Sequence, residues 1–263
     1  DPNSKVLCAD LKWRNANTIK IGQELIAFPE NLDGHIKLIS SHVTGKIIQH
    51  TPKFHIITDR GSTIVSANHR FVTLHDDRRK RMFSMLSWVR AKDLKIGDTL
   101  RFAKKPWRTG KNKNDGWMSG ILDGEGWITR GVGVGQNKGR VLNAIIKWLN
   151  QHHIQWNDHE DRNHTTGNIC VKIGISGIWN GLKVLGITRP LRLTHTIARK
   201  IWENRRAFTN GRHEAVVTDI VPLGVGTVVS LQTTTKTLIH DGFLGHNCTI
   251  YFNECSQLPW GPV

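Results

Sequence analysis

Cysteine is scarce in this chain of 263 residues, with four residues at wide and irregular spacing. They form neither a CxxC pair nor the dense framework of a small disulfide-rich domain, so a reduced, cytoplasmic protein is expected. No apolar run approaches the roughly eighteen residues that a membrane span requires, and residues 1–7 lack the apolar core of a signal peptide. We therefore expect neither membrane insertion nor export.

Acidic residues are also few: 21 Asp and Glu stand against 37 Lys and Arg, which gives a formal net charge of +16. The excess is local, because residues 104–212 carry 19 basic and 7 acidic side chains, a net charge of +12, whereas the rest of the chain carries 18 and 14. Such a surplus is typical of a surface that neutralises phosphates. The alternative is a solvated basic surface that serves solubility.

Residues 8–103 read as short β-strands separated by turn residues, without a long helical period. A repeat with a spacing of 75 residues lies within them. It pairs Ala16 with Ala91, Ile19 with Leu94, Lys20 with Lys95, Ile21 with Ile96, Gly22 with Gly97 and Leu25 with Leu100. A repeated strand-turn-strand unit predicts two pseudo-symmetric β halves. The β pattern resumes at residues 213–247, which are expected to complete the same β domain.

Residues 104–212 have a different pattern. They begin with a basic linker, KKPWRTGKNKND, which predicts a domain boundary. The apolar spacing that follows predicts the order helix-strand-strand-helix-strand-strand-helix. The second of these helices has one apolar face, formed by Val141, Leu142, Ile145, Ile146 and Leu149. We therefore expect an α+β unit inserted into one β domain.

The chemistry is concentrated near the two ends. Asn247 carries a side-chain amide that can attack its own carbonyl, and Cys248 after it carries a thiol nucleophile. His246, directly before them, is a possible proton donor. Cys8 can attack the preceding carbonyl as a thiolate and replace that amide by a thioester. The departing nitrogen needs a proton, and His69 is the residue type whose pKa suits this task. The alternative is a disulfide between Cys8 and Cys248.

Four segments carry a family resemblance: CADLKWRNANTIKIGQELIAF, GSTIVSANHRF, TVVSLQTTTKTLIHDGF and GHNC resemble the motifs of inteins. The resemblance implies a mainly β Hint splicing domain, a pseudo-two-fold horseshoe, over residues 8–103 and 213–247. Residues 1–7 and 248–263 would be the host flanks that are ligated in cis. It implies thioester formation, transfer to a second thiol, asparagine cyclisation and ligation, without a cofactor. The implied catalytic residues are Cys8, Ser66, His69, His246, Asn247 and Cys248.

Two positions depart from the intein pattern. Ser66 stands where the second motif has a threonine, and we expect it to orient the junction, in part through an oxyanion contact. Ser230 and Thr235 align where the next-to-last motif often has an aspartate and a histidine. Asp219 and His240 are the alternative groups that could tune thiol transfer to Cys248.

The segment WMSGILDGEGW resembles the LAGLIDADG motif of homing endonucleases, whose half-fold has the element order expected for residues 104–212. Gly116, Gly120 and Gly124 recur every four residues, so they share a helix face that a second helix can approach closely. The resemblance implies site-specific cleavage of double-stranded DNA for homing, with Glu125 as the acid that binds Mg²⁺. Asp123 is a second candidate for the metal, and the alternative expected for it is to cap or support the helix end. Because the chain holds one copy of the motif, we expect a homodimer through this helix.

The endonuclease resemblance also implies contacts with DNA. Gln136 and Lys172 correspond to polar residues that flank the catalytic site. Bases would be read by strand side chains, and phosphates by Arg140 and the basic tail. The base-reading side chains are Arg130, Gln136, Lys138 and Lys172. The alternative is a splicing element whose central domain binds DNA but no longer cuts it.

The segment TIYFNECSQLPW, which follows Cys248, resembles a stretch of phage terminase large subunits. The host would then be a DNA-packaging ATPase in the cytoplasm of a bacterial or phage-infected cell. A secreted Hint-type autoprocessing domain is disfavoured, because Cys248 and a host-like flank follow Asn247.

Overall fold

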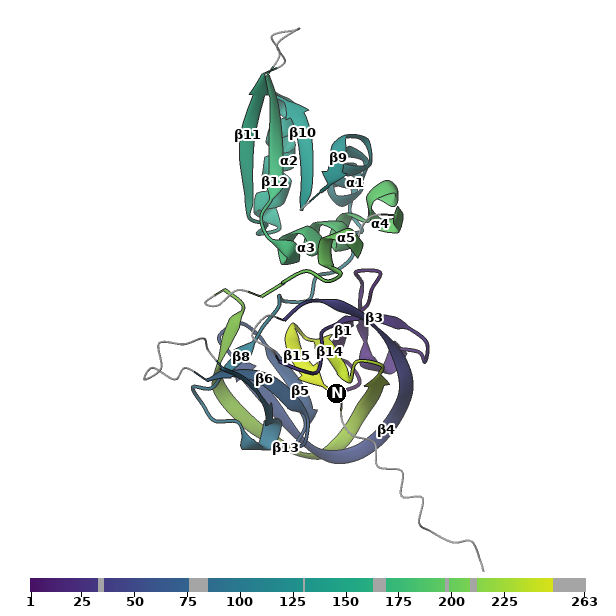
Figure 1. Cartoon of the computed structure of the whole chain (residues 1–263), viewed down its shortest axis with the longest axis vertical. Coiled ribbons are helices and arrows are strands. Elements are labelled where there is room, and N and C mark those ends of the chain that lie inside the picture. The colour runs from purple at the N-terminus through teal and green to yellow at the C-terminus, as the bar shows by residue number, and fades with distance from the viewer. Residues whose placement is uncertain are drawn as a thin grey trace, which may run out of the picture.

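The computed structural model describes residues 1–32, 36–75, 85–129, 131–162, 169–196, 199–208 and 212–247. The chain is mainly β, with one sheet of 11 strands and one of four. Figure 1 shows the large sheet as a ring of strands, with a smaller unit of helices and strands above it.

The large sheet is built from both ends of the chain. Its strands are β1 (Lys5–Leu7), β2 (Trp13–Asn15), β3 (Glu24–Ala27), β4 (Ile39–Thr58), β5 (Ser62–Ser66), β6 (Arg70–His75), β7 (Met85–Arg90), β8 (Thr99–Arg101), β13 (Glu214–Thr233), β14 (Thr237–His240) and β15 (Phe243–His246). Their order is β2-β1-β14-β15-β6-β8-β13-β4-β3, with β5 beside β4 and β7 beside β6. The expectation that residues 213–247 complete the first β region is confirmed.

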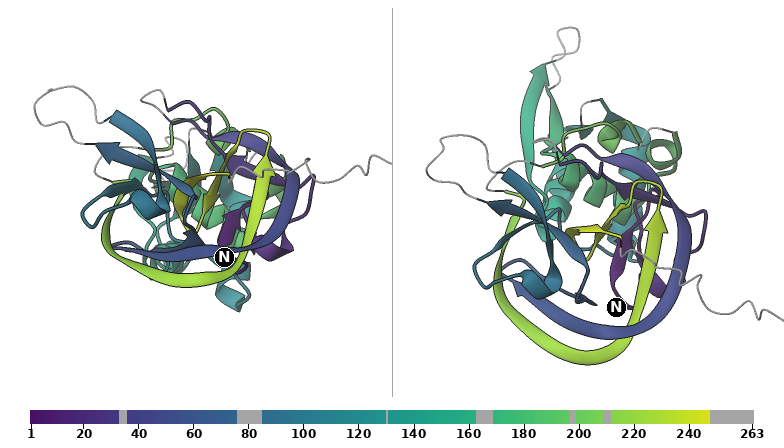
Figure 2. Two further views of the ribbon diagram at one scale, coloured as in Figure 1. Left: turned by 90° about the horizontal axis from the view of Figure 1, so that it is seen from below. Right: turned by 60° about the horizontal axis from the view of Figure 1, so that its bottom comes forward.

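Two strands of 20 residues, β4 and β13, pair antiparallel over residues 43–58 and 217–233 and curve around the ring (Figures 1 and 2). The prediction of short strands only is wrong here. The register shifts between Val217 and Asp219 and between Pro222 and Val225. Each shift interrupts the alternation of inward and outward side chains, so one bent strand reads in sequence as several short ones.

The 75-residue repeat corresponds to a structural repeat. A 3-10 helix opens each copy, η1 (Ala16–Thr18) and η2 (Ala91–Asp93), and a strand closes it, β3 and β8. Gly22 and Gly97 both have positive φ, 83° and 95°. The amide of Gly22 donates to β4 and that of Gly97 to β13, so the two copies dock on the two long strands in the same way.

The smaller unit confirms the predicted order of elements. It contains α1 (Lys113–Glu125), β9 (Gly126–Ile128), β10 (Val132–Asn137), α2 (Arg140–Gln151), β11 (Trp156–Arg162), β12 (Ile169–Ile175), α3 (Ile178–Thr188), α4 (Leu191–Thr196) and α5 (Arg199–Trp202). Its strands run in the order β11-β12-β10-β9, all antiparallel. The predicted apolar face of α2 is buried except at Val141, which is 39% exposed, and the half-buried Ile146.

The two units touch through polar contacts to the loop after β1. The indole nitrogen of Trp107 donates to the carbonyl of Leu11 (3.0 Å), and Arg189 donates to that of Asp10 (2.5 Å). One apolar cluster includes buried side chains of both units, among them Leu11 and Leu185. Within the described residues, no helix combines the length and the apolar character that crossing a membrane requires.

Candidate active site at the C-terminal junction

Antiparallel pairing of β15 with β14 and β6 brings the closing motif into the centre of the ring, where His246 lies opposite Arg70. A pocket beside it gathers four of the predicted catalytic residues, Ser66, His69, His246 and Asn247. Its remaining polar lining comes from distant strands and from the amino terminus: Asp1, Ser4, Ser230 and His240.

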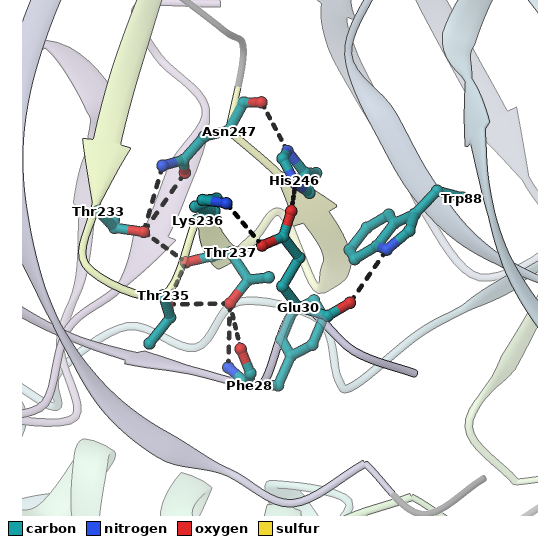
Figure 3. Close-up of polar contacts among 9 residues, drawn as sticks. All are labelled: Phe28, Glu30, Trp88, Thr233, Thr235, Lys236, Thr237, His246 and Asn247. Carbon is teal, nitrogen blue, oxygen red and sulfur yellow. Dashed lines mark hydrogen bonds and ion pairs between the residues drawn. The ribbon is translucent and has the colours of Figure 1, made fainter. Parts of the chain in front are cut away.

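The side chain of Asn247 is held against β13. Its carboxamide lies 3.3 Å (Nδ2) and 3.4 Å (Oδ1) from the hydroxyl of Thr233 (Figure 3). When the amide is turned over, its nitrogen donates to the carbonyl of Leu231 (3.2 Å) and its oxygen accepts the N–H of Thr233 (2.7 Å). We adopt the second orientation because each end then meets a partner of the opposite kind. The attacking amide is thereby fixed beside its own backbone.

His246 contacts an acceptor with each ring nitrogen (Figure 3). Nδ1 lies 2.8 Å from the carbonyl oxygen of Asn247, and Nε2 lies 2.9 Å from Oε1 of Glu30. The ring is 6% exposed and packs edge-on against Trp88. Since neither oxygen can donate, only an imidazolium satisfies both contacts with a proton. His246 is therefore placed as a cationic donor to the carbonyl that precedes Cys248.

Glu30 is positioned by contacts on both of its sides. Its carboxylate pairs with Lys236 (3.0 Å), and its backbone carbonyl accepts from the indole of Trp88 (3.2 Å). Hydrogen bonds from His246 and Lys236 lower the pKa of Glu30, which keeps it ionised. The hydroxyl of Thr237 bonds the backbone of Phe28, which ties the segment carrying Glu30 to β14.

His69 belongs to a buried pair of histidines. Its Nε2 lies 2.9 Å from Nε2 of His240. Thr63 donates to Asp241 (2.7 Å), so its oxygen is left to accept from Nδ1 of His240 (3.3 Å). His240 then accepts the Nε2 proton of His69, which leaves Nδ1 as the bare nitrogen of neutral His69. Burial, and then His240, lower the pKa of His69 well below its usual range.

Gly245 is required by this pair. A Cβ at that position would lie 2.6 Å from Nε2 of His69 and 2.8 Å from the ring of His240. No real Cβ comes so close, so any other residue would push the two rings apart. The contact of the two rings therefore explains why the closing motif has glycine at position 245.

Cys8 is not brought to His69. Its amide nitrogen donates to the carbonyl of Lys12 (3.0 Å), and its sulfur accepts from Nε2 of Gln23 (3.2 Å). The residue is 1% exposed and does not line the pocket, and burial raises the pKa of its thiol to about 11. The prediction that His69 protonates the nitrogen of Cys8 is therefore not supported by this geometry.

Asp1 lines the same pocket as His69, and its backbone nitrogen donates to the carbonyl of Ile64 (2.9 Å). Residues 5–7, predicted as part of a flank, form β1 and pair with β2 and β14. They are thus built into the sheet.

Ser230 and Thr235, which align with the next-to-last intein motif, lie apart, and of the two alternative groups His240 lines the pocket whereas Asp219 does not. Ser230 lines the pocket and its hydroxyl accepts from Gln49 (3.0 Å), whereas Thr235 bonds Ser41 (2.8 Å) outside that lining. Asp219 is exposed on β13, away from the pocket, and bonds the following amide. Cys248 itself, and the host-like segment 249–260, lie outside the described residues.

In the smaller unit, Asp123 is a helix cap. Its two carboxylate oxygens accept the backbone N–H groups of Leu191 and Arg192, both at 2.9 Å, at the start of α4. The alternative expected for Asp123, support of a helix end, is thus seen at α4, and metal binding by Asp123 stays a prediction. Among the described residues, no group of three or more His, Cys, Asp or Glu side chains could hold a metal ion.

Glu125 is exposed at the last position of α1, beside an open helix face. A Cβ added at Gly116, Gly120 or Gly124 would meet no atom within 4 Å. Nothing in the described part of this chain therefore covers the glycine face, which leaves it accessible to a second helix.

The predicted base-reading side chains do not share one face of the sheet. Gln136 lies opposite the buried Val171, whereas Lys172 lies opposite Gly135, and successive residues of a strand point to opposite faces. The two lysines are also paired with acids of β11. Lys138 pairs with Glu160 (2.6 Å) and Lys172 with Asp161 (2.5 Å). Arg140 is exposed at the first position of α2, and Arg130 lies outside the described residues.

No family model matches the chain, and no curated protein matches it. Its structural neighbours are mini-inteins. They include the Ssp DnaB mini-intein variant M86, with 11% identity and a TM-score of 0.45 over 97% of this chain and 95% of that one. The DnaX mini-intein from Spirulina platensis has 12% identity and a TM-score of 0.38, over 94% of this chain and 97% of that one. The transcription factor IIB Mvu mini-intein has 14% identity and a TM-score of 0.36, over 94% of this chain and 98% of that one.

Sequence reasoning missed three residues that support the site. Glu30, Thr63 and Asp241 each lie one contact away from a predicted histidine. Glu30 is 216 residues from His246 and belongs to no motif, so only the pairing of β14 with β15 and β1 could have revealed it. Asp241 directly follows His240, and this acid-histidine pair near the closing motif was the available signal.

Proposed function

We propose that the chain is a self-splicing element of the intein type, built on a Hint fold, with its C-terminal junction between Asn247 and Cys248. One observation carries the proposal: Nδ1 of His246 lies 2.8 Å from the Asn247 carbonyl oxygen, with Glu30 on the other side of the ring. Negative charge develops on that oxygen when the carbonyl is attacked, and a fixed cationic donor stabilises it.

In the proposed step, Nδ2 of Asn247 bonds its own carbonyl carbon and the peptide bond to Cys248 breaks. His246 donates to the carbonyl oxygen and then supplies the proton that the departing nitrogen takes up. The proton that Nδ2 loses returns His246 to its starting state. The products are a succinimide at the end of residues 1–247 and a free amino group on Cys248.

Full splicing also requires an acyl group to reach the thiol of Cys248 before Asn247 cuts. The intein resemblance assigns the first transfer to Cys8: its sulfur would bond the Leu7 carbonyl carbon, the Leu7–Cys8 amide would break, and the freed amino group of Cys8 would take up a proton. In this structure Lys12 and Gln23 engage the nitrogen and sulfur of Cys8, so both contacts have to open before that step. No cofactor takes part in these steps.

The proposal is tested by following the intact mass of residues 1–263 in reducing buffer over time. We expect the wild type to lose residues 248–263, and Asn247→Ala and His246→Ala to leave the chain whole. The matched control is His42→Ala, an exposed histidine outside the pocket lining, which should behave as the wild type. An Asn247→Ala chain that is cut at the wild-type rate would overturn the proposal.

We further propose that residues 104–212 bind double-stranded DNA, as a homodimer through the open glycine face of α1. The net charge of +12 in this part of the chain supports binding. Of the two alternatives from the sequence, binding without cleavage is favoured. Asp123 is engaged as a cap, which leaves Glu125 as the one predicted acid per chain for Mg²⁺.

The two alternatives are separated with a duplex and a Mg²⁺ titration. Retention of the duplex without nicking supports binding alone. Mg²⁺-dependent nicking that disappears in Glu125→Gln, but not in Glu160→Gln, would support the endonuclease. A duplex that the chain does not retain at low salt would contradict both.

A further inference from the structure

A second cavity, of about 560 Å³, lies where the two units meet. Its walls come from the turn between β4 and β5, from the linker after β8, from the start of α3 and from the segments before β13. The splicing steps do not use it, although Arg206 belongs to the basic tail, LRLTHTIARKIWENRR, that is expected to contact phosphates. Its charged side chains are Arg60, Lys104, Arg206 and Arg212.

All four charges are positive, and no carboxylate lines the cavity among the residues that the structure describes. Three of the four are arginines, whose planar guanidinium groups suit phosphate oxygens. His153 and Gln155 add further polar lining. Four like charges facing one space repel each other unless an anion lies between them.

Lys104 shows the excess of positive charge in the cavity most clearly. It is half-buried, and its ammonium bonds the neutral side-chain oxygen of Asn180 rather than a carboxylate. Burial, and then the nearby charge of Lys183, lower the pKa of Lys104 to about 8. A bound anion would compensate the ammonium that burial destabilises.

The amino end of α3 opens into the same cavity. Gly177 is its N-cap residue, and no side chain caps the helix. The φ of Gly177 is 79°, which favours glycine, so the usual capping residues are strained at this position. The first N–H groups of the helix, at Ile178 and Trp179, therefore have no side-chain cap and lie in the cavity wall.

We propose that this cavity binds a phosphate group, held by Lys104, Arg206 and the amino end of α3, with Arg60 and Arg212 completing the charge. Two sources share this chemistry: a free phosphate or nucleotide, and the phosphodiester backbone of DNA. The site is separate from the splicing pocket and does not depend on the chain being a splicing element.

The test uses the full chain with Asn247→Ala, so that it stays whole. Inorganic phosphate is titrated by calorimetry at low ionic strength. We expect saturable binding that weakens at least 10-fold in Lys104→Met and in Arg206→Ala, with no change in Lys20→Met, an exposed lysine on the β ring. Arg206 is exposed, so its variant stays informative if Lys104→Met unfolds.

A short duplex is then added to the phosphate complex. Displacement of phosphate by the duplex assigns the site to a DNA phosphodiester. Persistence of phosphate binding beside the duplex assigns it to a free phosphate or nucleotide. Absence of saturable phosphate binding, or equal affinity in the Lys104, Arg206 and Lys20 variants, overturns the proposal.

Discussion

His246 has to donate in two directions, and this explains the need for Glu30. A neutral imidazole carries one proton and could serve either Glu30 or the Asn247 carbonyl, whereas the imidazolium serves both. The carboxylate of Glu30 stabilises the charged ring. Glu30 is thus a positioning residue that acts on the cleaved bond through His246.

Glu30→Gln should slow cleavage after Asn247 on the order of 10-fold. This is the lower end of what a hydrogen bond to a charged group contributes, because Glu30 is 44% exposed. The measurement is the rate of release of residues 248–263 as a function of pH.

Glu203→Gln is the matched control, because Glu203 is an exposed acid of the other unit that pairs with Arg199. Its rate and pH profile should equal those of the wild type. A Glu30→Gln chain that releases residues 248–263 at the wild-type rate would remove the role of Glu30 in positioning His246.

Cys8 should react slowly while Lys12 and Gln23 engage it. Its thiol is 1% exposed and its pKa of about 11 keeps it protonated near pH 8. In a chain whose other cysteines are serine, iodoacetamide should label Cys8 only after denaturation, and Cys8→Ala should still release residues 248–263. Rapid labelling of native Cys8 would contradict its burial, and loss of release in Cys8→Ala would show that cleavage after Asn247 depends on it.

The repeat of η1–β3 and η2–β8 depends on two turns that need positive φ. Gly22→Ala and Gly97→Ala should each destabilise the fold by about 1 kcal/mol or more, because a Cβ disfavours this conformation. Urea unfolding measures the effect. Gly116→Ala, in the exposed face of α1, should be neutral or stabilising by up to about 1 kcal/mol when measured at a concentration that keeps the chain monomeric.

Equal losses at Gly22 and Gly97 would show that the two halves have equivalent turns. A neutral result at either glycine would contradict the need for its positive φ. Both positions have open space around an added Cβ, so backbone conformation is the only cause the variants probe.

How far the sequence predicted these elements depends on how local their signals are. The repeat and the order of elements in the smaller unit were predictable, because glycine turns and helical periodicity depend on residues that are close together in the sequence. The 20-residue strands were not, because bulges near Asp219 and Pro222 break their alternation. A capping role for Asp123 was expected from its place near the end of α1, but the helix that it caps is α4, 68 residues away, which no local pattern reveals.

The fold buries His69 and holds it uncharged. Burial, then His240 and His246 all disfavour a proton on His69, so the unfolded chain binds a proton more readily than the folded one. Stability is therefore complete above the unfolded pKa, near 6.5, and falls as the pH drops below it. The change is at most about 1.4 kcal/mol per pH unit for this one group.

His69→Gln should flatten this dependence. The free energy of unfolding, measured in urea between pH 5 and pH 8, should fall less steeply towards low pH in the variant than in the wild type. His42→Gln, an exposed histidine, should leave the slope unchanged. Identical slopes for wild type and His69→Gln would show that His69 is not held neutral by the fold.

The most direct test of the central claim is the chemical form of the new end of the chain. Residues 1–263 are incubated in reducing buffer, quenched in acid, and the fragment ending at Asn247 is sequenced by tandem mass spectrometry. We expect an aminosuccinimide at Asn247, formed by attack of its own side chain, and its absence in Asn247→Ala. An asparagine with a free carboxylate from the earliest time point, without the imide, would mean that water cuts the bond and would contradict the account.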